Sequence, residues 1–281
     1  MVDGSAVVDG LVVVDKAAGW TSHDVVAKCR GIFGQKKIGH SGTLDPDATG
    51  VLLVGLGRVT RLLRFLTALP KSYVGEVVLG TATSTLDSSG EVLASFDMSV
   101  TADEVAAAAV RFVGDIEQVP PMVSAVKIGG KRLHELARAG EEVERAARPV
   151  HVSRFDTAPT DDPLVYRIEV DCSSGTYIRT LAADLGEALG GGAHLRNLRR
   201  TAIGSFTVAE AAWLDTELPV LSPAEALRDY PSVVLTAEQV VDIRHGKRVE
   251  LPEETVRVLD GDGDLVAIAE AGRTAVVVPS T

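Results

Sequence analysis

The sequence predicts an α+β fold with a small β-rich domain at its C-terminal end. Apolar runs of strand length and stripes of helical spacing follow one another without a regular βαβα order, and no internal repeat is visible. After residue 222 the pattern changes to one helix and several short strands. We therefore expect a large domain over residues 1–222 and a small one over residues 223–281 of this 281-residue chain.

The first elements are a buried strand and an amphipathic helix. The apolar run Leu-Val-Val-Val at residues 11–14 predicts the strand. Thr21 is suited to cap the helix, because Asp24 stands three residues later, at the capping-box position. The apolar stripe of this helix consists of Val25, Val26, Cys29, Ile32 and Phe33.

A loop rich in glycine and threonine is expected next. Residues 39–50 read Gly-His-Ser-Gly-Thr-Leu-Asp-Pro-Asp-Ala-Thr-Gly. Glycine permits positive φ and close approach of other atoms, and Pro46 fixes φ directly after Asp45. The same residue types form ordinary surface turns, but this arrangement is also suited to holding the Asp45 carboxylate in one place.

The later elements follow from the same patterns. Thr101 and Glu104 form a second capping pair at the head of an alanine-rich helix. The apolar patterns predict helices over residues 58–69, 101–113 and 179–189, and strands over residues 73–79 and 165–172.

Two short motifs approach ligand-binding loops without meeting their requirements. Residues 34–41 resemble a Walker A loop, but His40 stands where the lysine is needed, and a helix instead of a strand comes before it. Residues 260–264 resemble the start of a calcium loop, but Leu265 and Ala271 replace its glycine and glutamate. We therefore expect neither nucleotide hydrolysis nor a metal site, and a hairpin turn at residues 260–263.

Charge is distributed unevenly along the chain. The net charge is −11, but residues 210–281 hold 14 acidic and 6 basic residues and account for −8 of it. Basic residues gather in the large domain, on both sides of residues 39–50, over residues 127–154 and at residues 196–200. Such clusters are either solvated helix faces or a local surface that binds phosphates with salt-sensitive affinity.

Hydropathy and cysteine usage indicate a cytoplasmic protein with no membrane association. No apolar run reaches the roughly 18 residues of a membrane helix. Residues 1–5 lack the basic region of a signal peptide. Cys29 and Cys172 lack metal-ligand spacing, and we expect both to be reduced and buried.

Motifs over residues 11–210 resemble, in the same order, those of the bacterial TruB family, the tRNA pseudouridine-55 synthases, in an actinobacterial-like form. Residues 39–50 resemble the family signature GHxGTLDPxATG. Further matches are residues 15–22 (DKPxGxTS, with Ala17 replacing the proline), 71–73 (KxY), 79–90 (LGxxTxTxDxxG), 119–127 (the xPPxxSAxK part of QxPPxxSAxK), 172–181 (CSxGTYIRxL) and 192–201 (GAHLxxLRRT).

The resemblance implies a fold, an activity and a partner. The fold is the pseudouridine synthase fold, a central mixed, mostly antiparallel sheet flanked by helices, with an RNA-gripping insertion at residues 116–154 and a PUA-like domain at residues 223–281. The activity is isomerisation of the T-loop uridine at tRNA position 55, flipped out of its loop, with no cofactor. The partner is the tRNA T stem-loop, and we expect a monomer with no obligatory protein partner.

The resemblance also implies roles for individual residues. Asp45 is the essential catalytic carboxylate, acting either as a nucleophile at C1′ or as a base at C2′. Arg179 pairs with this aspartate and keeps it ionised. Tyr73 stacks on the target base, and His40 fills the space that the flipped uridine leaves. The residues implied to support the pocket are Tyr177, Leu198 and Asp87.

Contacts with RNA are expected from a set of basic side chains. Lys16 either touches the RNA backbone or braces the site. The others are Lys127, Lys131, Arg132, Arg199 and Arg200. The net charge of −8 over residues 210–281 argues against strong direct phosphate binding by the C-terminal domain.

Two other functions remain open. A non-catalytic RNA-binding or RNA-folding protein of the same fold does not need the pair Asp45 and Arg179. A glycosidase-like hydrolase would use Asp45 with Asp87 and would not require RNA. Release of tritium from C5-labelled uridine in tRNA separates the three functions.

Overall fold

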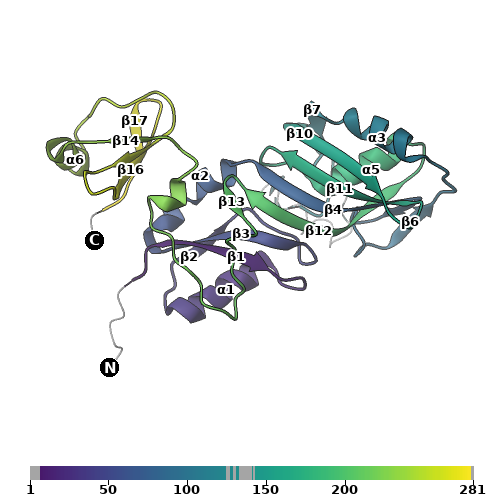
Figure 1. The fold of residues 1–281 in the computed structure, drawn as a ribbon, viewed down its shortest axis with the longest axis horizontal. Coiled ribbons are helices and arrows are strands. Elements are labelled where there is room, and N and C mark those ends of the chain that lie inside the picture. Colours follow the sequence, from purple (N-terminus) through teal and green to yellow (C-terminus); the bar gives the residue numbers. More distant parts are fainter. Residues whose placement is uncertain (1–6, 125–126, 129–130, 133–140, 142, 280–281) are drawn as a thin grey trace. The chain divides into compact units, whose positions relative to one another are not determined.

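The computed structural model describes residues 7–124, 127–128, 131–132, 141 and 143–279, and the chain forms two compact units (Figure 1). The first unit comprises residues 1–46, 50–68 and 203–281, and the second comprises residues 47–49 and 69–202. Backbone bridges from Leu11 to Leu221 and from Val14 to Ala212 tie residues 203–222 to the N-terminal strand, and the expected boundary at residue 222 stays a prediction.

The first unit is built on three antiparallel strands and one helix. Strand β3 (Thr49–Leu56) pairs with β1 (Gly10–Lys16) and with β2 (Ile38–Ser41). Helix α1 (Ser22–Phe33) has the expected capping box between Thr21 and Asp24. Its stripe packs on the strands in one core, which includes Val12, Val14, Val25, Val26, Cys29, Leu52 and Val54. Each such side chain contributes about 1.5–3 kcal/mol on burial.

Two expectations for this unit were wrong in detail. Residues 39–50 are not one loop, because β2 takes residues up to Ser41, β3 begins at Thr49, and only residues 42–48 form the loop. The expected helix at residues 58–69 is a 3₁₀ turn, η1 (Gly57–Arg61), followed by helix α2 (Leu63–Ala68). The break falls at Leu62, whose N–H bonds to the Val59 carbonyl three residues earlier.

The second unit is a sheet covered by two helices. Its strand order is β12 (Ala193–Ile203), β4 (Lys71–Leu79), β11 (Val165–Cys172), β10 (Arg148–Pro159) and β7 (Gly114–Gln118). The strands from β4 to β7 in this order pair antiparallel. Helices α3 (Ala102–Val110) and α5 (Ile178–Ala188) pack against this sheet in a single apolar core. The expected strands at residues 73–79 and 165–172 and the Thr101–Glu104 capping box are confirmed.

Short hairpins connect the larger elements of the second unit. Strands β5 (Thr81–Thr83) and β6 (Val92–Ser95) form one, and β8 (Lys127–Ile128) and β9 (Lys131–Arg132) form another. A two-residue strand, β13 (Phe206–Thr207), follows β12. The segment that holds β8 and β9 lies inside the expected RNA-gripping insertion.

The C-terminal part of the first unit is the expected small β-rich region. It contains η2 (Glu225–Leu227), β14 (Ser232–Val234), α6 (Ala237–Arg244), β15 (Val256–Leu259), β16 (Leu265–Glu270) and β17 (Arg273–Val277). The four strands form one sheet and share an apolar core with α6 (Figure 1). Because this core is its own, we retain residues 223–281 as a proposed domain.

The turn between β15 and β16 is the expected hairpin turn. One side-chain oxygen of Asp260 accepts hydrogen bonds from the backbone N–H groups of Asp262 and Asp264, at 3.1 and 3.0 Å. The Asp260 side chain therefore stabilises the turn by hydrogen bonds to its backbone.

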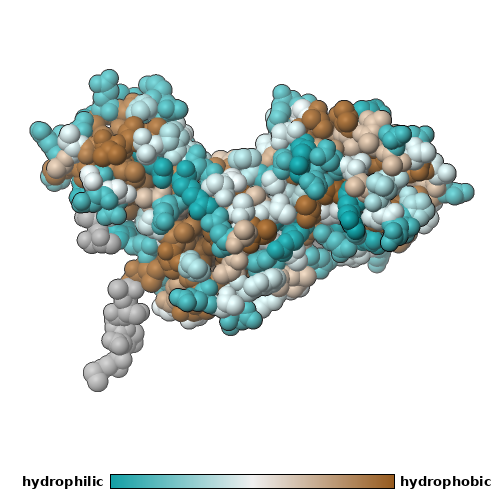
Figure 2. Space-filling view, in the orientation of Figure 1, coloured by the Kyte–Doolittle hydropathy of each residue, from teal (hydrophilic) through white to brown (hydrophobic). Residues whose placement is uncertain are grey.

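Polar and apolar side chains are interspersed over the visible face of both units (Figure 2). In the part of the chain that the structure describes, no helix combines the length and the apolar character needed to cross a membrane.

Candidate active site

The loop that carries Asp45 is held at the residues on both sides of this aspartate. The Ser22 hydroxyl accepts a hydrogen bond from Leu44 N at 2.9 Å and donates one to Leu44 O at 3.2 Å. The Pro46 carbonyl accepts hydrogen bonds from Gly19 N at 2.9 Å and from the Lys16 ammonium at 3.0 Å. Asp45 itself is half-buried. Residues 16–22 thus fix the backbone that aims this carboxylate.

Lys16 is the centre of this support. Its side chain is fully buried, and its ammonium also donates to the carbonyl oxygens of Ala17 at 3.1 Å and Trp20 at 2.7 Å. A buried ammonium is costly unless hydrogen bonds replace its water. Of the two roles left open for Lys16, its burial and these hydrogen bonds favour the bracing role, because a side chain with no exposed surface does not reach an RNA phosphate in this conformation.

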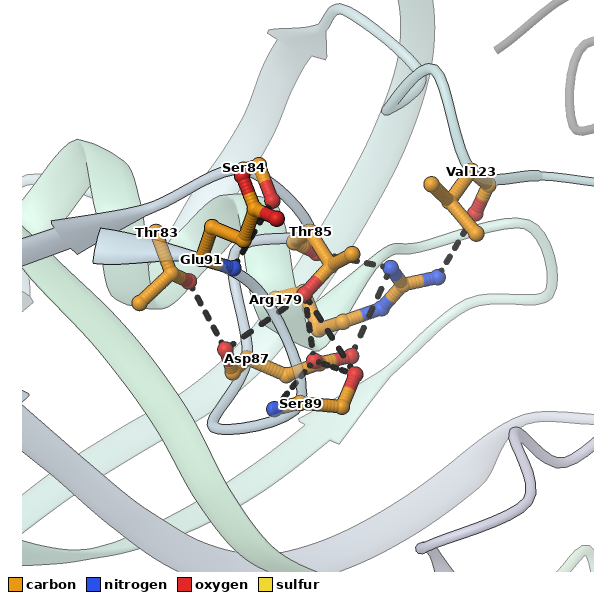
Figure 3. Close-up of polar contacts among 8 residues, drawn as sticks. All are labelled: Thr83, Ser84, Thr85, Asp87, Ser89, Glu91, Val123 and Arg179. Atoms are coloured by element: carbon orange, nitrogen blue, oxygen red, sulfur yellow. Dashed lines mark hydrogen bonds and ion pairs between the residues drawn. The ribbon is translucent and has the colours of Figure 1, made fainter. Parts of the chain in front are cut away.

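Arg179 lies at the start of α5 and joins this helix to two loops (Figure 3). One terminal nitrogen donates to the Thr85 carbonyl and the other to the Val123 carbonyl, each at 2.8 Å. The first nitrogen also lies 3.6 Å from a carboxylate oxygen of Asp87. Arg179 is only 5% exposed, and these neighbours help to fix the orientation of its guanidinium.

Asp87 organises the loop that faces Arg179. One carboxylate oxygen accepts hydrogen bonds from the Thr85 hydroxyl at 2.6 Å and from the Ser89 N–H and hydroxyl at 3.0 and 2.6 Å (Figure 3). The loop is strained, because Leu86 has a φ of 63°. Backbone bonds to Leu195 on β12 anchor it. A carboxylate held in this way supports its loop and the arginine.

The remaining predicted pocket residues also lie in the second unit. Tyr73 is on β4 and Leu198 is on β12, and both are half-buried against the same apolar core. Tyr177 is the N-cap residue of α5, two positions before Arg179. In the first unit, His40 lies on β2 with its ring edge-to-face against His23 of α1, at a centroid distance of 5.3 Å.

The predicted RNA-contacting arginines of β12 differ in exposure. Arg199 is half-buried and lies 3.4 Å from the Thr49 hydroxyl. Arg200 is 1% exposed, so the expectation that it contacts RNA does not fit this conformation. It lies near the buried Lys71, and burial together with the charge of Arg200 lowers the pKa of Lys71 to about 8. The side chains of Lys127, Lys131 and Arg132 lie outside the described residues.

Sequence reasoning missed one residue that touches this site. Gln118, at the end of β7, binds the backbone of Tyr177 with both of its amide atoms. It stands two residues before Pro120 and matches the glutamine that opens the family motif QxPPxxSAxK, so the sequence did carry a signal for it.

Comparison with solved structures defines the class of protein. A chain of the crystal structure of a Cbf5-Nop10-Gar1 complex matches with a TM-score of 0.74 and 28% identity, covering 95% of this chain and 79% of that one. A chain of the H/ACA RNP bound to a substrate RNA containing 2′-deoxyuridine matches with a TM-score of 0.72 and 25% identity, at 95% and 79% coverage. The fold is therefore that of an α+β enzyme of the pseudouridine synthase type.

Comparison with protein families narrows the class. The model of the TruB family pseudouridylate synthase (N terminal domain) matches residues 30–178, and that of the tRNA pseudouridylate synthase B C-terminal domain matches residues 179–218. The tRNA pseudouridine synthase B of Mycobacterium ulcerans (strain Agy99) is 46% identical over 96% of this chain and 94% of its own length. That of Nocardia farcinica is 49% identical over 90% and 80%. The chain belongs to the TruB family.

Proposed function

We propose that the protein isomerises the T-loop uridine at position 55 of tRNA to pseudouridine, using Asp45 and no cofactor. The observation that carries the proposal is the braced loop of Asp45 in a chain of the TruB family. The reaction breaks the C1′–N1 bond, turns the base and joins C5 to C1′, with the C5 proton released. Atoms and electrons balance without a donor or an oxidant, so a correctly placed carboxylate is the main chemical requirement.

Asp45 acts on the ribose in this proposal, as a nucleophile at C1′ or as the base that removes the C2′ proton. The fixed positions of Leu44 and Pro46 support either role, because they leave the carboxylate few orientations. The pairing of Asp45 with Arg179 is retained as a prediction of the family resemblance.

The pocket residues have separate proposed tasks. Tyr73 stacks on the flipped base, and Tyr177 and Leu198 form apolar walls. Asp87 supports Arg179, as its hydrogen bonds to the loop suggest. His40 occupies the space left in the T loop. The support for these tasks is the half-burial of these side chains and the family resemblance.

We further propose that the C-terminal domain binds an RNA phosphate despite its negative charge. A pocket with a volume of about 420 Å³ lies between the turn after α6 and the start of β17. Three of its lining residues are basic: Lys247, Arg248 and Arg273. Lys247 pairs with Asp242, whereas Arg248 and Arg273 form no ion pair among the residues that the structure describes. A local basic pocket binds phosphate through its own charges, whatever the net charge of the domain.

The partner of the protein in this proposal is tRNA alone. The structurally similar Cbf5 chain comes from a complex with Nop10 and Gar1, whereas the curated relatives carry the name of a tRNA enzyme. We propose a cytoplasmic monomer without an obligatory protein partner. Sedimentation of the protein with and without tRNA, at concentrations above the dissociation constant, tests this stoichiometry.

Release of tritium from tRNA labelled at C5 of uridine tests the activity. The wild type is expected to release tritium from an unmodified transcript, and Asp45→Asn is expected to lower the rate by on the order of 10³-fold or more. Asp47→Asn is the matched control, because Asp47 is exposed two residues further on. Absence of release by the wild type would refute the proposed activity, and equal release by wild type and Asp45→Asn would refute the role of Asp45.

The two alternative functions would give different products in the same assay. A binding protein releases no tritium while it still binds tRNA. A hydrolase yields free base and an abasic site in place of pseudouridine. Chromatography of the digested product separates these outcomes.

A further inference from the structure

A buried glutamine connects the start of the RNA-gripping insertion to the start of α5. Gln118 is 2% exposed and is the last residue of β7. Its amide nitrogen donates to the Tyr177 carbonyl at 3.0 Å, and its amide oxygen accepts from the Tyr177 N–H at 2.7 Å. Both ends of one side-chain amide therefore bind the backbone of one residue, which fixes the position and the rotation of that residue.

The residue that is bound in this way begins α5. Tyr177 is the N-cap, and it makes no capping hydrogen bond with its own side chain. The first N–H groups of a helix lack partners within the helix, so an outside acceptor helps to define where the helix starts. Gln118 supplies an acceptor to the N-cap residue from another strand.

A second connection runs parallel to the first. Arg179 donates to the Val123 carbonyl, five residues after Gln118. Residues 118–123 and residues 177–179 are therefore joined twice, once by the Gln118 amide and once by the Arg179 guanidinium. A shift of Tyr177 would change the direction in which its own side chain and that of Arg179 leave the helix.

We infer that Gln118 is a positioning residue of the active site, which acts by fixing the backbone of Tyr177 and thereby the orientation of Tyr177 and Arg179. The inference rests on the proposed function for its effect on the reaction, and on the hydrogen bonds alone for its effect on α5. Gln118 is buried, so it is not expected to contact tRNA itself. Its loss should therefore lower the rate of the chemical step much more than the affinity for tRNA.

The chain offers a matched control for this substitution. Gln35 binds Val8 with the same two-point arrangement, since its amide oxygen accepts from Val8 N and its amide nitrogen donates to Val8 O, each at 2.9 Å. Gln35 and Val8 belong to the first unit and include none of the predicted site residues. Gln118→Ala and Gln35→Ala therefore each remove one pair of side-chain amide hydrogen bonds to a backbone. Only Gln118→Ala removes bonds to a residue of the α5 N-terminus.

The first test measures the reaction. In single-turnover isomerisation with enzyme in excess, Gln118→Ala is expected to lower the rate by on the order of 10²-fold, the effect of a displacement of about 1 Å at the reacting groups. The dissociation constant for tRNA should change less than about 3-fold. Gln35→Ala should leave the rate per folded molecule unchanged. An unchanged rate in Gln118→Ala would overturn the inference.

Gln118→Glu adds a pH-dependent test. An ionised carboxylate accepts from the Tyr177 N–H but repels the Tyr177 carbonyl, whereas a protonated carboxyl donates to that carbonyl and restores both hydrogen bonds. The rate of Gln118→Glu relative to wild type should therefore rise as the pH falls, while that of Gln118→Ala should not. Parallel pH profiles for the two variants would contradict the inference.

Amide hydrogen exchange tests the positioning independently of activity. Gln118→Ala should speed exchange in a peptide that covers residues 175–181, and Gln35→Ala should not. Unchanged exchange there would overturn the inference even if the wild type isomerises uridine. An inactive wild type would refute the proposed function, while faster exchange at residues 175–181 would still support the role of Gln118 in fixing α5.

Discussion

The ammonium of Lys16 donates a hydrogen bond to the carbonyl oxygen of Pro46, 30 residues further along the chain and directly after Asp45. The contact links the end of β1 to the loop of the candidate catalytic residue. Because Lys16 is fully buried, its ammonium is hydrogen-bonded inside the protein and is not on a surface that RNA could contact.

Lys16→Met should therefore impair catalysis without weakening RNA binding. Methionine has a similar volume but donates to none of the carbonyls of Ala17, Trp20 and Pro46, so the loop of Asp45 loses a fixed support. We expect the single-turnover rate to fall by about 10–100-fold with a small change in the tRNA dissociation constant. Lys28→Met, at an exposed position of α1, is the control. A loss of affinity at constant rate would instead indicate an RNA contact.

The basic pocket of the C-terminal domain should affect binding and not chemistry. Arg248→Gln and Arg273→Gln should each raise the dissociation constant for tRNA and lower the slope of log Kd against log salt concentration by about 1. The single-turnover rate at saturation should stay unchanged. Arg244→Gln, an exposed change on α6 outside the pocket lining, should alter neither quantity. An unchanged salt slope in both pocket variants would refute the phosphate contact.

Lys71 should make stability rise with pH in the alkaline range. Burial and Arg200 lower its pKa from 10.5 to about 8 in the folded state, so between about pH 8 and pH 10.5 the unfolded chain binds more protons. In this window the free energy of unfolding gains up to about 3 kcal/mol from Lys71. Urea titrations at pH 7.5 and 9.5 should show this gain in the wild type, and Lys71→Met should lack it. An equal pH dependence in both proteins would show that Lys71 is charged in the fold.

Two identical substitutions should have opposite effects on stability. Ala271 has a φ of 49° in the exposed turn between β16 and β17, where glycine avoids the strain of a side chain. Ala271→Gly should raise the free energy of unfolding by about 0.5–1 kcal/mol. Ala107→Gly, at an exposed position inside α3, should lower it by about 1 kcal/mol. Thermal unfolding of the two variants checks the signs, and a destabilised Ala271→Gly would contradict the argument.

Local patterns were sufficient to predict several elements. The capping pairs Thr21–Asp24 and Thr101–Glu104 predicted the starts of α1 and α3, because a cap and its partner are neighbours in sequence. The local pattern did not predict strand β3. Residues 51–56 are almost entirely apolar, but residues 49–50 belong to the glycine-rich segment that predicts a loop. Whether an apolar run is a strand depends on which strands pair with it, here β1 and β2.

Local sequence patterns predict even less of the candidate site. The motif at residues 39–50 predicts Asp45, and the family resemblance left a bracing role open for Lys16. Nothing local indicated that Ser22 and Lys16 bind the backbone of Leu44 and Pro46. The buried state of Arg200 also depends on the packing of β12 and not on the run of bases in which it stands. Side chains that act across 20 or more residues of sequence become visible only in the fold.

The segment order of the first unit has a consequence for synthesis on the ribosome. Its last part, residues 203–281, is separated from the first two by residues 69–202 of the second unit, and β1 obtains its bridges to Ala212 and Leu221 only after about 200 further residues have been made. Strand pairings between residues far apart in the sequence form late in folding. Until then the backbone N–H and C=O groups on one edge of β1 lack their partners in residues 212–221. The nascent chain should therefore fold residues 69–202 before the first unit is complete, and it should depend on chaperones that shield unpaired strands during that interval.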